Sequence, residues 1–142
     1  MERKIVVVDA SVAVKWFVEE EYSEEANLLK DAYVGGLLDL VAPVLLPYEV
    51  LNALKYSGHF GEDELKEVAS ILEDYQITLY IIEGDLGSKT VEIAMRKGLT
   101  VYDAAYVALA DKLKTVLYTA DEKLVRKISD ENLVKHIADL EI

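Results

Sequence analysis

The sequence predicts an α/β fold in which a parallel β-sheet is covered by helices on both faces. Short apolar segments rich in β-branched residues alternate with longer helix-like segments throughout the chain. This alternation is typical of parallel sheets, because two parallel strands need a long crossover connection, which is usually a helix. The length of 142 residues suits one domain with a substantial core. We therefore expect residues 1–142 to form a single domain.

The first half of the chain begins with an uninterrupted β-branched segment, residues 4–9, which indicates a buried strand. A short helix is expected at residues 11–19, and Ser23 is a suitable N-cap for a second helix that ends near Gly35. Pro47 suits the first turn of a later helix. The other expected elements in this half are a strand at 39–42, the Pro47 helix running to about Gly58, and a helix at 62–74.

The second half continues the same alternation. It is expected to contain a strand at 76–82, a helix from Asp85 to Gly98, a helix at 102–114, a strand at 115–119, a short helix at 121–129 and a last strand at 133–137. The segment 102–114 is apolar almost all round, so we expect it to be buried against the sheet.

The composition limits the kinds of site that the chain can form. It has no cysteine and only two histidines, which excludes disulfides, thiolate metal sites and His-rich zinc sites. Oxygen ligands remain, and these suit hard ions such as Mg²⁺ or Mn²⁺. A formal net charge of −12 does not attract nucleic acid by itself. A nucleic-acid substrate would therefore require a metal ion and a local basic patch.

The composition also bears on the location of the protein. No apolar segment approaches the roughly 20 residues of a membrane helix. The opening residues 1–4 lead into a strand and carry no cleavage site of the signal-peptide kind, so a cytoplasmic protein is expected. A single glutamine beside plentiful Glu and Lys indicates a thermophile-like composition.

Four acids lie where a strand or a turn leads into a helix: Asp9, Glu49, Asp103 and Asp121. Ligands of an open parallel sheet bind in the crevice outside the carboxyl ends of its strands. Carboxylates gathered there repel one another unless a positive charge lies between them. The pattern therefore predicts a divalent metal site and chemistry on phosphates.

Each of these acids also has a purely structural interpretation. Asp9 and Asp121 can cap the helices that follow them, and the helix dipole alone favours Glu49 in a first turn. Asp103 completes an approximate capping box with Thr100. Capping alone does not fully explain Asp103, because burying an unpaired carboxylate at the start of a buried helix costs free energy. Asn52, three residues after Glu49, lies on the same helix face and is able to help hold a metal-bound water.

Four segments, taken in order, resemble the motifs of a PIN domain, and most closely those of the VapC toxins of VapBC toxin–antitoxin pairs. The segments are Val8–Val12, Pro47–Leu54, Tyr102–Ala110 and Thr119–Leu124. The resemblance spans nearly the whole chain. It implies a three-layer α/β/α sandwich with a central five-stranded parallel sheet, and metal-dependent cleavage of single-stranded RNA. It further implies a small antitoxin partner that blocks the site, and a homodimer.

On this interpretation the four acids bind one or two Mg²⁺ or Mn²⁺ ions, with Asp9 and Asp103 as direct ligands and Glu49 and Asp121 acting directly or through water. The metal makes a bound water more acidic for attack on the phosphate. Three polar residues are expected to orient ligands or water: Ser11, Asn52 and Thr119. A small basic patch is either a phosphate contact or an ordinary helix face: Lys123, Arg126 and Lys127.

Other functions of similar folds fit the sequence less well. A receiver domain needs an acidic pair after its first strand, and a haloacid-dehalogenase-type phosphatase needs a second Asp where this chain has Ser11. Two further alternatives stay open. One is a PIN nuclease that processes RNA or acts on DNA without an antitoxin, and the other is a non-catalytic interaction module of the same fold.

Overall fold

The computed structural model describes residues 3–142, so the first two residues of the predicted domain and of the opening segment 1–4 lie outside the described residues. Five strands form one sheet in the order β3-β2-β1-β4-β5, and every pairing is parallel. The strands are β1 (Lys4–Val8), β2 (Leu38–Pro43), β3 (Thr78–Tyr80), β4 (Leu117–Thr119) and β5 (Val134–His136). The predicted five-stranded parallel sheet is confirmed.

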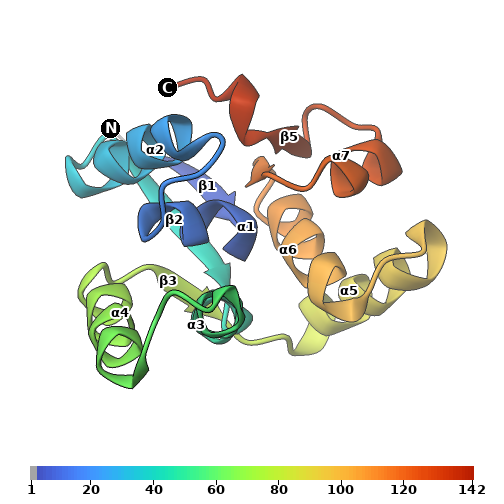
Figure 1. The fold of residues 1–142 in the computed structure, drawn as a ribbon. Helices are drawn as coiled ribbons and strands as arrows, with labels where there is room; N and C mark the ends of the chain where they lie inside the picture. Colours follow the sequence, from blue (N-terminus) through green and yellow to red (C-terminus); the bar gives the residue numbers. More distant parts are fainter. Residues whose placement is uncertain (1–2) are drawn as a thin grey trace.

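Seven α-helices flank this sheet in the described part of the chain (Figure 1). They are α1 (Ala10–Ala13), α2 (Ser23–Val34), α3 (Leu45–Ser57), α4 (Glu62–Asp74), α5 (Gly84–Lys97), α6 (Val101–Lys112) and α7 (Glu122–Ile128). In Figure 1 α5 and α6 lie side by side, and α3 packs beside α4. Short 3₁₀ turns follow α1 and β5, at Val14–Trp16 and Ile137–Asp139. The α/β class is thus confirmed.

The centre of the core is formed by β1 and α6. Residues 6–8 of β1 and residues 104–110 of α6 are all buried, and α6 packs against β1, β2 and β4. The predicted burial of this helix is confirmed for residues 104–110, whereas Tyr102, Lys112 and Lys114 at its ends are exposed. Since both elements are fixed in the core, the residues at their ends, Asp9 and Asp103, are held in place by the packing.

Some predicted details of the elements are wrong. Ser23 is the first residue of α2 and not its N-cap; its hydroxyl accepts a hydrogen bond from Glu20 N and donates one to Val18 O, which closes the preceding loop. The predicted strand 76–82 shrinks to β3, because Gln76 ends the α4 region with a φ of 53° and β3 is an edge strand that pairs only with β2. The helix expected at 11–19 is a single α-helical turn continued by a 3₁₀ turn.

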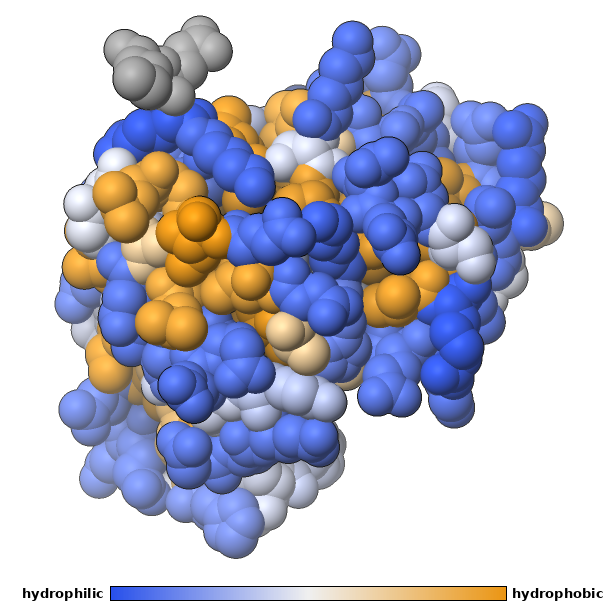
Figure 2. Space-filling model, turned by 90° about the horizontal axis from the view of Figure 1, so that it is seen from above, coloured by the Kyte–Doolittle hydropathy of each residue, from blue (hydrophilic) through white to orange (hydrophobic). Residues whose placement is uncertain are grey.

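Hydrophilic side chains dominate the face seen in Figure 2, and apolar residues reach the surface there in patches. Exposed large apolar side chains of the described residues include Tyr48, Met95 and Tyr102. Within residues 3–142, none of the helices combines the length and apolar character needed to cross a membrane.

Candidate functional site

The candidate site lies where the strand order of the sheet reverses. β1 is flanked by β2 on one side and by β4 on the other. Ligands of open parallel sheets bind outside the carboxyl ends of the strands at such a point. Asp9 directly follows β1, and Thr119 ends β4. The two residues meet because Val8 pairs with Tyr118 in the sheet.

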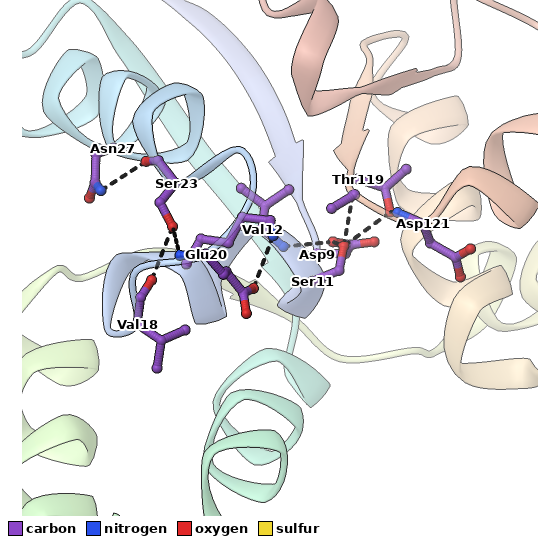
Figure 3. A network of polar contacts seen from close by, with 11 residues as sticks. Asp9, Ser11, Val12, Val18, Glu20, Ser23, Asn27, Thr119 and Asp121 are labelled. Carbon is purple, nitrogen blue, oxygen red and sulfur yellow. Dashed lines mark hydrogen bonds and ion pairs between the residues drawn. The ribbon is translucent and has the colours of Figure 1, made fainter. Parts of the chain in front are cut away.

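Asp9 is held by a hydrogen-bond network that links the ends of β1 and β4 (Figure 3). Its Oδ1 accepts from Ser11 Oγ at 2.6 Å and from Val12 N at 3.3 Å. Ser11 Oγ also lies 3.2 Å from Thr119 Oγ1 and accepts from Ala120 N at 2.8 Å. The hydroxyl of Ser11 thus donates to Asp9 and is also in contact with the hydroxyl of Thr119.

Burial makes the Asp9 carboxylate costly to ionise. Only 8% of Asp9 is exposed. Burial raises its pKa from 3.8 to about 6, although bonds from Ser11, Thr119 and Val12 favour the ionised form. The negative charge of Asp103 makes a smaller contribution to this raised pKa, so the two carboxylates interact electrostatically.

Glu49 is half-buried on α3 and accepts a hydrogen bond at Oε1 from Tyr106 Oη, at 2.7 Å. Burial raises the pKa of Glu49, the Tyr106 hydroxyl lowers it, and the charge of Asp103 raises it. The helix starts at Leu45, so Pro47 lies in its first turn as predicted, whereas Glu49 lies just beyond that turn. The helix dipole, which fades within a turn, therefore does not explain this acid.

Sequence reasoning missed Tyr106. This side chain is 2% exposed. Its pKa is raised by burial, by the bond to Glu49 and by the charges of Glu49, Asp9 and Asp103. Tyr106 thus lies among three of the four acids. The sequence did contain one indication of its role: Tyr106 follows Asp103 by three residues, so the two residues share a helix face.

Asp103 lies in the first turn of α6 and is half-buried. Burial and then the charge of Asp121 raise its pKa, while Thr100 and Lys127 lower it. Its backbone N–H donates to Thr100 Oγ1 at 3.0 Å, which is the first half of the predicted capping box. The charge of Asp103 also acts on Asp9 and Glu49, so Asp103 is the centre of the cluster.

Asp121 caps α7, with Oδ1 accepting from Lys123 N at 2.9 Å and from Leu124 N at 3.3 Å. The prediction that Asp9 and Asp121 cap the helices that follow them is thus confirmed. In both residues the capping bonds go to Oδ1. A residue can therefore cap a helix and also take part in the acid cluster, because these capping bonds leave its Oδ2 atom for another ligand.

The donor set of this cluster fits a hard divalent cation. Within the described residues, none of the four acids forms an ion pair with a basic side chain. All available ligand atoms are oxygens, as Mg²⁺ and Mn²⁺ prefer. As the side chains stand in residues 3–142, no three acids or histidines converge closely enough to enclose an ion. Binding would therefore have to draw the less buried carboxylates toward Asp9.

Two other predicted residues, Asn52 and Lys127, have different surroundings. Asn52 is exposed and lines a cavity of about 510 Å³ together with Glu49 and Tyr102. Lys127 Nζ donates to Gly98 O at 2.9 Å, and its charge lowers the pKa of Asp103.

The three residues of the predicted basic patch, Lys123, Arg126 and Lys127, all lie on α7. Arg126 lines another cavity, together with Tyr22 and His136, and its guanidinium lies 3.8 Å from Glu122. Lys123 is exposed. The charge of Lys127 is one of the influences that lower the pKa of Asp103.

Comparison with known proteins identifies the family. The family model for the PIN domain matches residues 6–129. The chain belongs to the PIN-domain family. A curated relative, Ribonuclease VapC3 of Pyrobaculum aerophilum, is 37% identical over 127 residues, which cover 86% of this chain and 93% of the relative.

Solved structures share the PIN fold of this chain. The crystal structure of PAE2754 from Pyrobaculum aerophilum matches with a TM-score of 0.64 and 24% identity, covering 96% of this chain and 93% of that one. A toxin–antitoxin complex from Klebsiella pneumoniae matches with a TM-score of 0.69 and 16% identity, covering 96% and 99% of the two chains. At these identities the likeness concerns the fold alone.

Proposed function

We propose that this PIN domain, a single domain spanning residues 1–142, is a metal-dependent endoribonuclease that cleaves single-stranded RNA and is the toxin of a toxin–antitoxin pair. The observation that carries the proposal is the cluster of four carboxylates without ion-pair partners at the carboxyl end of the sheet. The relative named Ribonuclease VapC3 supports this choice of substrate class.

The roles of the acids follow from their surroundings. Asp9 and Asp103 are the direct ligands of Mg²⁺ or Mn²⁺, and Glu49 and Asp121 complete the site directly or through water. A bound divalent ion offsets the negative charge at the phosphate and makes a water molecule more acidic. Without it, the carboxylates would repel the RNA backbone.

The polar neighbours act by holding these ligands in position. Ser11 and Thr119 fix the rotamer of Asp9 through the network between β1 and β4. Tyr106 fixes Glu49 from the core side. Asn52 lies in the cavity beside Glu49, where its amide is free to contact substrate or water. Lys127 contributes a positive charge that acts on Asp103, and Lys123 and Arg126 lie on the same helix, α7.

The proposed partners are an antitoxin protein and a second copy of the chain, in the cytoplasm of a thermophile. A toxin–antitoxin complex among the structures with this fold supports the first partner. Exposed apolar side chains on α5, Val91 and Met95, support a homodimer.

Cleavage of a labelled single-stranded RNA tests the proposal. Purified protein is incubated with Mn²⁺ or with EDTA, beside the Asp9→Asn variant and a DNA strand of the same sequence. We expect cleavage of RNA with Mn²⁺ and its loss in EDTA and in Asp9→Asn. Folded protein that cuts neither strand, and whose melting temperature Mn²⁺ does not raise, would instead be a non-catalytic module. Cleavage of the DNA strand alone would overturn the substrate class.

A further inference from the structure

Two exposed tyrosines lie beside the acid cluster. Tyr48 and Tyr102 are 75% and 59% exposed, although each belongs to a helix that packs in the core. Each directly precedes one of the acids, Glu49 or Asp103. Both line the same open cavity of about 510 Å³, together with Glu49 and Asn52. The two tyrosines and one of the four acids, Glu49, therefore share one cavity.

The chemistry of this cavity suits nucleobases better than phosphates. None of the five residues that line it is basic, and the whole chain carries a formal charge of −12. Contacts to the RNA backbone are therefore weak at this place. Stacking of a base on an aromatic ring needs no charge on the protein, tolerates any base, and contributes about 1–3 kcal/mol per base.

We propose that Tyr48 and Tyr102 bind unpaired bases of the substrate by stacking, next to the phosphate that the acid cluster cleaves. This inference rests on the proposed ribonuclease function and extends it. It also gives a physical reason for the choice of single strands. A duplex keeps its bases stacked on one another, so their faces are not available to the two tyrosines.

Binding of a fluorescent, non-cleavable single-stranded RNA analogue in the presence of Mn²⁺ measures the stacking directly. Tyr48→Ala and Tyr102→Ala should each weaken binding by about 5- to 150-fold. Tyr48→Phe and Tyr102→Phe keep the ring and should bind within about two-fold of the wild type, since stacking needs the π-face alone. Tyr56→Ala is the matched control, because Tyr56 is 74% exposed on α3 and does not line the cavity.

An RNA with abasic positions gives the second test. It keeps the phosphates and lacks the bases, so the wild type should bind it as weakly as the alanine variants bind normal RNA. Unchanged affinity in both alanine variants would overturn the inference, and so would equal binding of abasic and normal RNA. Loss of binding together with a halved molecular mass in light scattering would also overturn it, because the tyrosines would then lie between two copies of the chain.

Failure of this inference differs from failure of the proposed function. If the wild type cuts RNA with Mn²⁺ while the alanine variants bind RNA normally, only the stacking is wrong. If the wild type neither binds nor cuts RNA, both proposals are wrong.

Discussion

Asp9 and Asp103 belong to one cluster but are held in different ways. Asp9 is 8% exposed and receives hydrogen bonds from Ser11 and Val12. Asp103 is half-buried, and the largest influences on its pKa are burial and the charge of Asp121. The rotamer of Asp9 is thus fixed by hydrogen bonds, whereas the Asp103 carboxylate lies among the other acids and its charge acts on theirs.

The difference shows how the fold prepares a cluster of like charges. One carboxylate is fixed by hydrogen bonds at the end of a central strand, where its ionised form is opposed by burial. The others lie nearer the surface, where water moderates their repulsion until a cation binds. We expect substitutions at either acid to weaken ion binding, and substitutions at Asp9 also to change the stability of the metal-free protein.

The largest expected effect is on the stability of the metal-free protein. The pKa of Asp9 is 3.8 ordinarily and about 6 in the fold, so the folded state binds the proton more tightly than the unfolded state. Stability therefore falls as pH rises through this window, and ionised Asp9 costs up to about 3 kcal/mol above it. Asp9→Asn removes this cost. In EDTA at pH 7 we expect the variant to be more stable than the wild type.

Denaturant unfolding at several pH values checks this prediction. The gap between Asp9→Asn and the wild type should narrow as pH falls below about 6, where Asp9 takes up its proton. The pKa values of Glu49 and Asp103 are also raised, and both groups are present in the two proteins. Their contributions therefore largely cancel in the comparison. If the difference in the free energy of unfolding between the two proteins did not change with pH, burial of the Asp9 carboxylate would not be its cause.

Addition of Mn²⁺ should reverse this order of stability. An ion that binds only the folded state, at 1,000 times its dissociation constant, adds about 4.1 kcal/mol, which exceeds the advantage of up to about 3 kcal/mol expected for Asp9→Asn in EDTA. We expect the melting temperature of the wild type to rise, and the rise to be largely lost in Asp9→Asn and Asp103→Asn. Asp111→Asn is the control, because Asp111 also lies on α6 but is paired with Lys89 outside the cluster. An equal rise in all four proteins would place the ion elsewhere.

Thr119→Val tests the network that fixes Asp9. The buried Thr119 hydroxyl contacts Ser11 Oγ and accepts from Asp121 N at 3.1 Å. Valine keeps the shape and leaves that N–H unpaired, so we expect a loss of about 1–3 kcal/mol in the free energy of unfolding. RNA cleavage should fall by about 10- to 100-fold, the usual effect of losing a group that orients a metal ligand.

Thr90→Val is the matched control for Thr119→Val. Thr90 is equally buried, but its hydroxyl donates to Leu86 O within α5. We expect its substitution to leave cleavage unchanged. If both variants lost cleavage equally, the effect of Thr119 would be general destabilisation and not the placement of Asp9.

The smallest expected effect on stability is that of Tyr106→Phe. The variant loses the bond from Tyr106 Oη to Glu49, at a cost of about 1 kcal/mol, because half-buried Glu49 regains contact with water. Cleavage should fall by about 10-fold, since Glu49 is then free to leave its position. Tyr118→Phe is the control, because Tyr118 is also buried and its hydroxyl contacts only Glu141 N, near the C-terminus. Equal cleavage by both variants would contradict the positioning role of Tyr106.

Local patterns account for most of what could be predicted. The β-branched segment before Asp9 and the apolar segment after Asp103 became β1 and α6 because burial requires such sequences. The prediction failed at Ser23 and Gln76, where loop contacts and a left-handed backbone outweighed propensity. The hydrogen bond between Tyr106 and Glu49 joins residues 57 positions apart, and local patterns carry no information about such a pair.

The sequence by itself determined the α/β class, the family motifs and the identity of the four acids, because all of these depend on residue type and short-range order. Only the tertiary structure decided how the acids differ. It buried Asp9 between β1 and β4, placed Asp103 among the other acids and set Tyr106 behind Glu49. The reason is physical: burial and charge coupling depend on distances across the sheet, and those distances exist only once the strands have paired.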